Sequence, residues 1–123
     1  MDKSISAKML VTSGISGLIG VAAGAFGSHI LKGHLSAEML EIFKTGVLYQ
    51  LIHSVVIFAI SVSGIQRLTK ASLFFAAGIV LFSFSLYAYS LTSIKFITMI
   101  TPLGGISFLA GWLMLIINGI KSN

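Results

Sequence analysis

The sequence contains no cysteine, a single proline, and three acidic residues against eight basic ones. Without cysteine the chain has no disulfide, no thiolate nucleophile and no cysteine-ligated zinc site, and cysteine usage says nothing of its redox compartment. Charged residues make up 9% of the chain, whereas soluble domains carry about 25%. Because so few charges cannot cover a surface in contact with water, we expect residues 1–123 to form a single domain whose solvent is lipid.

Catalytic motifs are missing as well. No aspartate or glutamate lies within an apolar run, and there is no HExxH motif, phosphate-binding loop or dinucleotide-binding motif. We therefore expect a protein that is not an enzyme, with no catalytic residue, cofactor or metal site. The net charge of +5 would suggest nucleic acid as the partner of a soluble protein. Here the basic residues fall between apolar runs, as in membrane proteins, so no nucleic-acid partner is expected.

Four long apolar runs dominate the chain, each close to the ~20 residues that cross the hydrocarbon core of a bilayer. They cover residues 9–30, 46–64, 71–92 and 96–118. Each is predicted to be helical, because backbone groups inside lipid must be satisfied within the segment. The first run begins like a signal peptide but exceeds the about 7–15 apolar residues of a signal, so we expect it to be retained. The predicted fold class is all-α, an integral membrane four-helix bundle with both termini on one side.

The basic residues indicate which side that is. Five of them (Lys3, Lys8, Arg67, Lys70 and Lys121) would lie on the side of the termini, and three (Lys32, Lys44 and Lys95) on the other. Because cytoplasmic segments of membrane proteins carry the excess of lysine and arginine, both termini are predicted to be cytoplasmic.

The segment 36–45 is less apolar than the runs. Ser36 can cap a helix whose first turn holds Glu38, and apolar residues around Met39 recur at spacings of three and four. This pattern predicts a short amphipathic helical segment at the membrane interface, leading into the second span. A simple extension of the second span fits the same pattern, and both interpretations stay open.

Small residues form stripes along the first and fourth runs. Gly20 and Gly24 form a GxxxG pair, and Pro102 suits the first turn of the fourth helix. Small residues let helix backbones approach closely inside a membrane. We predict close helix packing at Gly17, Gly20, Gly24, Gly27, Gly104, Gly105 and Gly111, within one bundle or, alternatively, across a dimer face.

Polar side chains gather in one half of the predicted bundle. Since successive helices alternate in direction, the end of the first run, the start of the second and the end of the third meet at the same membrane side. The candidate polar cluster consists of His29, Tyr49, Gln50, His53, Ser83, Ser85 and Tyr87. Ionisable groups inside a membrane are functional-site candidates, and histidine binds protons near neutral pH. The alternative is a structural role in hydrogen bonds between helices.

Four stretches carry a resemblance to a known family: GAFGSHILKG, FKTGVLYQLIHS, LFSFSLYAYSLT and ITPLGGISFLAGW. In order, and over nearly the whole chain, they resemble the small bacterial membrane proteins of domain-of-unknown-function family 423, to which eukaryotic transmembrane protein 256 is related. Ser28 stands where the family motif usually has alanine, and Phe84 where it usually has glycine. The resemblance implies a four-helix protein of the bacterial cytoplasmic membrane without an established activity. Phe84 would fill space in the bundle and argues against an open cavity there.

Three kinds of function are compatible with these features. The first is a non-enzymatic scaffolding, assembly or envelope-maintenance role within the lipid bilayer, with a homo-oligomer or a membrane-protein partner. The second is a small oligomeric transporter or channel that moves a proton, an ion or a small solute through the polar cluster. The third is a membrane enzyme subunit that binds a lipid or a quinone there. Whether the cluster encloses a polar cavity distinguishes the first from the other two.

Overall fold

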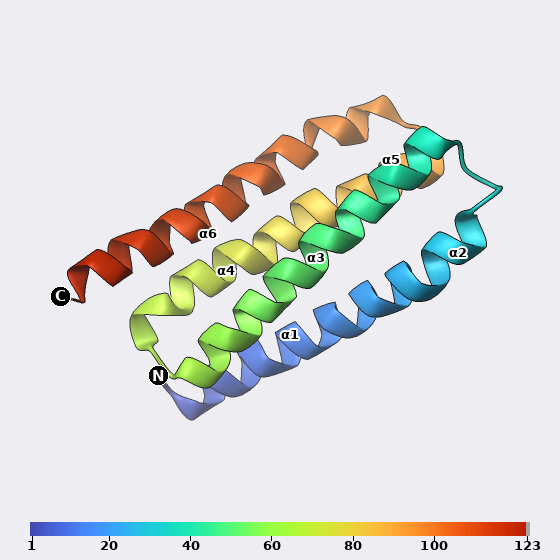
Figure 1. Cartoon of the computed structure of the whole chain (residues 1–123). Helices are drawn as coiled ribbons and strands as arrows, with labels where there is room; N and C mark the ends of the chain where they lie inside the picture. The colour runs from blue at the N-terminus through green and yellow to red at the C-terminus, as the bar shows by residue number, and fades with distance from the viewer. Residues whose placement is uncertain (123) are drawn as a thin grey trace.

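The computed structural model describes residues 1–122 as an all-helical chain (Figure 1). Four helical segments are long and apolar enough to cross a membrane: Lys3–Leu31, Ala37–Ser63, Gln66–Thr92 and Lys95–Lys121. The all-α class and the four long apolar helices are thus confirmed. Each segment begins before the apolar run predicted for it, because polar residues such as Asp2 and Ser36 cap turns that precede the run.

Two of the four segments contain a π-helical turn. The first segment consists of α1 (Lys3–Ala22), the π turn η1 (Ala23–Gly27) and the short helix α2 (Ser28–Leu31). The third consists of the 3-10 turn η2 (Gln66–Leu68), α4 (Thr69–Gly78), the π turn η3 (Ile79–Ser83) and α5 (Phe84–Thr92). A π turn changes the rotation of the helix after it and occurs frequently at functional sites.

The second and fourth segments are simpler. The second is one helix, α3 (Ala37–Ser63), and the fourth is the 3-10 turn η4 (Lys95–Met99) followed by α6 (Thr101–Lys121). The Ser36 hydroxyl accepts a hydrogen bond from the Met39 amide at 3.2 Å, and α3 then continues without a break to Gly64, which ends it with φ 68°. The segment 36–45 therefore forms the first turns of α3.

The helices are arranged with two spans in the middle and one on either side (Figure 1). α3 packs against the α4–η3–α5 series, α1 packs against α3, and α6 packs against α4 and η3. Both termini lie at the same end of the molecule. There the Met1 ammonium donates to the Gly64 carbonyl oxygen at 2.9 Å, and the Arg67 guanidinium donates to the Ser122 hydroxyl.

The core lies mainly between α3, α4 and α6, with one residue each from α1 and η3. It is formed by Met9, Ile57, Ile60, Ala71, Phe75, Ile79 and Phe108. Large apolar side chains also cover the outside of the molecule, where Leu18 is 73% exposed and Ile120 is 70% exposed. A soluble monomer rarely exposes contiguous apolar surface of this extent. This outer surface is therefore suited to contact with the hydrocarbon core of a membrane.

Candidate functional site

Gln50 lies at the centre of the polar cluster and is fully buried in α3. Its Nε2 donates to the carbonyl oxygen of Ser16 in α1 at 2.8 Å, and its Oε1 accepts from the Tyr87 hydroxyl of α5 at 2.6 Å. One amide side chain therefore connects three membrane spans. Such bonds hold helices together where lipid supplies no hydrophobic force between them.

Ser54 extends this network by one turn of α3. Its hydroxyl forms a hydrogen bond with the Ser16 hydroxyl at 2.6 Å and with the carbonyl oxygen of Gln50 at 2.6 Å. Both serines are buried. Ser16 is thus held to α3 through its backbone and through its side chain.

His53 uses both of its ring nitrogens. Nδ1 lies 2.7 Å from the carbonyl oxygen of Tyr49, and Nε2 accepts from the indole N–H of Trp112 in α6 at 3.1 Å. A carbonyl oxygen only accepts and an indole N–H only donates. The geometry therefore assigns the proton to Nδ1, leaves Nε2 unprotonated, and gives a neutral imidazole with both nitrogens hydrogen-bonded.

Aromatic rings surround the imidazole of His53. Phe108 stacks on it with the ring centres 3.7 Å apart and the planes 10° apart. Phe75 lies 5.4 Å away, and Trp112 packs edge-on at 5.8 Å. The ring of Tyr49 also stacks on it, at 6.1 Å, and His53 is only 4% exposed.

The predicted serines lie on the third span. The Ser85 hydroxyl bonds to the carbonyl oxygen of Phe82 at 2.8 Å and lies 2.6 Å from the hydroxyl of Thr101, at the start of α6. Ser83 ends the π turn η3 and is fully buried, and its hydroxyl has no hydrogen-bond partner among the described residues. A buried hydroxyl without a partner is uncommon in native proteins.

Two of the predicted cluster residues differ from the rest: His29 lies apart, and Tyr49 takes part only through its backbone and its ring. His29 is exposed on α2, which corrects the prediction that it joins the cluster. The face of this segment that meets α3 carries Gly27, and a residue two positions further along a helix lies about 200° around the axis. The side chain of His29 therefore turns away from α3. Tyr49 lies at the rim, 38% exposed, and its carbonyl oxygen rather than its hydroxyl joins the network.

Three residues of the network were missed in the sequence: Ser16, Ser54 and Trp112. A signal for Trp112 exists, because an indole N–H buried in an apolar helix normally finds an acceptor. Ser16 also has one, since it lies one helical turn before Gly20, on the face that meets α3.

Glycines bring the helices close enough for these bonds. Of the seven predicted packing glycines, Gly20, Gly24 and Gly27 lie against Leu51, Val47 and Phe43 of α3, Gly104 lies against the backbone of Leu81 and Phe82, and Gly111 lies against Phe75. At Gly17 and Gly105 an added Cβ atom would have no neighbouring atom within 4 Å, which corrects the prediction for these two. Both are partly exposed, and each lines a groove beside a neighbouring span instead of a close contact.

Two further glycines pack closely and were missed, because neither belongs to a stripe. A Cβ atom on Gly46 would lie 2.7 Å from the Tyr87 ring and 3.1 Å from the carbonyl oxygen of Ser83. Gly78 lies against the ring of Phe108. Gly46 therefore allows α3 to approach α5 closely enough for the bond between Gln50 and Tyr87.

Four apolar helices joined by buried polar side chains define a multi-pass membrane protein. The family model described as "Protein of unknown function (DUF423)" matches residues 23–105, and the chain belongs to this family, as the resemblance implied. The UPF0382 membrane protein YwdK of Bacillus subtilis is 38% identical over 117 residues, which cover 91% of this chain and 95% of the relative.

Two other relatives match over a similar length. The UPF0382 inner membrane protein YgdD of Escherichia coli K12 is 39% identical over 117 residues, covering 92% of this chain and 89% of the relative. The UPF0382 membrane protein SSP2132 of Staphylococcus saprophyticus is 39% identical, with coverages of 91% and 96%. No solved structure matches the chain. The protein is thus a multi-pass protein of the bacterial cell membrane.

Proposed function

We propose that this protein is a non-enzymatic component of the bacterial cytoplasmic membrane with a scaffolding, assembly or envelope-maintenance role. The observation that carries the proposal is the hydrogen bonding of His53, whose two ring nitrogens are both bound to other helical positions. A proton relay needs a nitrogen that exchanges its proton with water or with another titratable group. Nε2 of His53 faces the indole N–H of Trp112 instead. If Nε2 were protonated, both groups would be donors and could not form a hydrogen bond.

The other polar groups support the same role. Gln50 bonds to Tyr87 of α5 and to the Ser16 backbone of α1. Ser54 bonds to the Ser16 hydroxyl, so these polar groups hold three spans together. Five surface grooves, of about 170 to 460 Å³, are lined by residues other than Gln50, His53 and Tyr87. What remains for interaction is the apolar outside of the molecule, above all on the outer spans α1 and α6.

Reconstituted vesicles test this proposal. Purified protein is placed in liposomes that contain a pH-sensitive dye, and a pH step is applied across the membrane. We expect wild type and the His53→Gln variant to leave the vesicles equally tight, while a proton ionophore equilibrates them. Proton flux through wild type that His53→Gln abolishes would overturn the proposal.

Ser83 favours a second candidate function, a transporter or channel for a proton, an ion or a small solute. Its buried hydroxyl has no partner among the described residues and lies at a π turn, a feature common at functional sites. A transported solute would supply the missing partner in a rearranged state. The same vesicles decide this, because transport predicts a flux that Ser83→Ala reduces, whereas a scaffold predicts no flux in either variant.

The proposed orientation places both termini in the cytoplasm. The end of the molecule that holds the termini carries Lys3, Lys8, Arg67, Lys70 and Lys121, and the opposite end carries Lys32, Lys44 and Lys95. The excess of basic residues supports this orientation because it marks cytoplasmic segments. A partner protein or a second copy of the chain would then meet α1 or α6 from within the membrane.

A further inference from the structure

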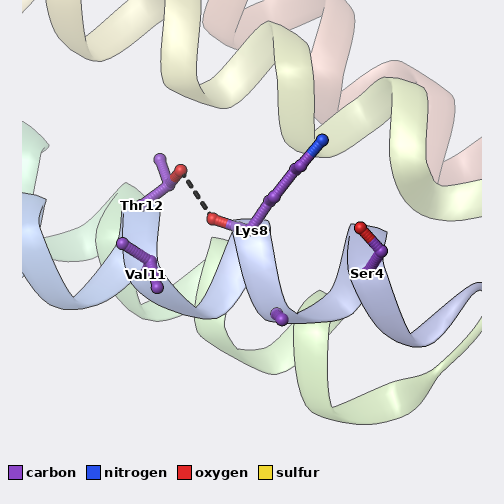
Figure 2. A pocket seen from close by; sticks show the side chains of 5 residues that line it. Ser4, Lys8, Val11 and Thr12 are labelled. Carbon is purple, nitrogen blue, oxygen red and sulfur yellow. Dashed lines mark hydrogen bonds between the residues drawn. The ribbon is translucent and has the colours of Figure 1, made fainter.

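One side of α1 bears a groove that changes in character along its length. Its first part, of about 460 Å³, is lined by Ser4, Lys8 and Thr12 together with two small apolar side chains. Figure 2 shows Lys8 and Thr12 extending from the same side of α1, with the Thr12 hydroxyl bonded to the carbonyl oxygen of Lys8 at 2.8 Å. The groove is therefore cationic and polar at the end near the N-terminus.

Its second part, of about 280 Å³, starts at Thr12 and is almost entirely apolar. It runs between α1 and the α4–η3–α5 series, where Ile15 and Ile19 face Val80 and Phe84. Because Thr12 lines both parts, they adjoin at this residue. We call the two parts together the α1 groove.

The depth of Lys8 in the membrane follows from the sequence around it. It is the last charged residue before an uncharged stretch of 23 residues, from position 9 to position 31, which spans about 34 Å as a helix. Since the hydrocarbon core is ~30 Å thick, the ammonium of Lys8 reaches the level of the lipid headgroups. From Lys8 to Ile19 the groove extends about 16 Å, roughly the depth of one leaflet.

The charge around Lys8 is unbalanced. Among residues 1–122 the sole ion pair joins Lys44 to Glu41 at the other end of the molecule, so the ammonium of Lys8 has no carboxylate partner. Among side chains, the same end carries four more lysines and arginines against one carboxylate, Asp2. Asp2 in turn accepts from the Ser4 amide at 2.7 Å as the cap of α1. An anion at this position would meet uncompensated positive charge.

We propose that the α1 groove binds one phospholipid with an anionic headgroup. The Lys8 ammonium and the Ser4 hydroxyl hold the phosphate, and one acyl chain lies between α1 and the α4–η3–α5 series, over Ile15, Ile19 and Val80. A cationic polar end at headgroup depth and an apolar length of one leaflet together match this amphiphile. Charge argues against a second copy in the groove, because a parallel copy would bring its own basic end against Lys8.

Native mass spectrometry of the delipidated full chain in detergent tests the proposal. The protein is titrated with phosphatidylglycerol and with phosphatidylcholine that carry the same acyl chains. Wild type is expected to retain one phosphatidylglycerol about fivefold more tightly than phosphatidylcholine, the effect of one lysine at an anionic lipid. The Lys8→Gln variant is expected to bind both lipids equally. Lys3→Gln, which removes the same charge at the same end but outside the groove, is expected to keep the preference.

A second pair of variants tests the apolar part. Ile15→Trp fills the groove and is expected to lower the binding of both lipids, whereas Leu18→Trp, on the outer side of α1, leaves it unchanged. Circular dichroism establishes that all four variants keep the helical content of wild type. Equal loss in Lys8→Gln and Lys3→Gln, equal binding in Ile15→Trp and Leu18→Trp, or a particle of two chains without lipid would each overturn the proposal.

Discussion

The indole N–H of Trp112 donates a hydrogen bond to Nε2 of His53 at 3.1 Å, joining α6 to α3. The same histidine is stacked on Phe108, one turn of α6 away from Trp112. Phe108 and Trp112 of α6 therefore both hold His53 of α3, Phe108 by ring stacking and Trp112 by a hydrogen bond. In a membrane, where helices gain little from apolar contact with each other, such a combination stabilises a particular pairing of spans.

Trp112→Phe removes this hydrogen bond and keeps an aromatic ring. We expect the free energy of unfolding to fall by about 1 kcal/mol, the size of a typical hydrogen bond between membrane helices. Unfolding in mixed micelles of increasing sodium dodecyl sulfate content, followed by circular dichroism, measures the change. Leu113→Phe is the control, because Leu113 is 55% exposed and faces lipid.

A double-mutant cycle separates the bond from the packing. His53→Phe in the Trp112→Phe background leaves no polar group of this pair unsatisfied. The two changes together are therefore expected to cost less than the sum of the single changes. Strict additivity would mean that the bond between Trp112 and His53 contributes nothing to stability.

Gln50→Leu removes the amide that connects α1, α3 and α5. The Tyr87 hydroxyl and the Ser16 carbonyl oxygen each lose a partner, and we expect a loss of about 2 kcal/mol in the free energy of unfolding. The same micelle titration measures it. Tyr87→Phe is expected to cost less, since it breaks one of the two bonds of Gln50.

Tyr49→Phe is the matched control for this network. Its hydroxyl forms no hydrogen bond within residues 1–122, and the ring is 38% exposed. We expect its removal to leave the stability unchanged. A loss as large as that of Tyr87→Phe would contradict the network described for Gln50.

The sequence predicts much of this arrangement, and physical reasons set the limit. Gln50 and His53 share one helix with polar residues at helical spacing, and the alternation of spans brings Ser85 and Tyr87 to the same depth. The depth of a residue in the membrane follows from its position along an apolar run. The pairing of side chains around each helix depends also on rotation about its axis, which the sequence does not fix.

His29 illustrates that limit. It lies at the expected depth, but on the face of α2 that turns away from α3. Gly27 at the end of the π turn η1 still meets α3, and His29, two residues further on, lies about 200° around the helix axis from it. The partners Ser16 and Trp112 were missed for a related reason, since each lies on a different span from the residue it binds.

Neighbouring glycines at the start of α6 provide a sharper test of helix packing. Gly104→Ala would place a Cβ atom 2.7 Å from the carbonyl carbon of Leu81 and the Cα of Phe82. Backbone atoms cannot rotate away, so we expect a loss of about 1–3 kcal/mol in unfolding free energy. Gly105→Ala meets no atom within 4 Å, and its gain in helix propensity is expected to leave the stability equal to wild type or higher. Equal effects of the two variants would contradict the packing described here.

The absence of cysteine makes the orientation directly measurable. His34→Cys and Gln66→Cys each introduce a single thiol, at opposite ends of the molecule and at exposed positions. With both termini in the cytoplasm, a maleimide that does not cross membranes is expected to label the His34→Cys variant in spheroplasts. The Gln66→Cys variant is expected to react only after the membrane is permeabilised. The wild-type chain, which has no thiol, gives the background. The reverse pattern would place the termini, and with them the basic end that holds Lys8, on the outer side of the membrane.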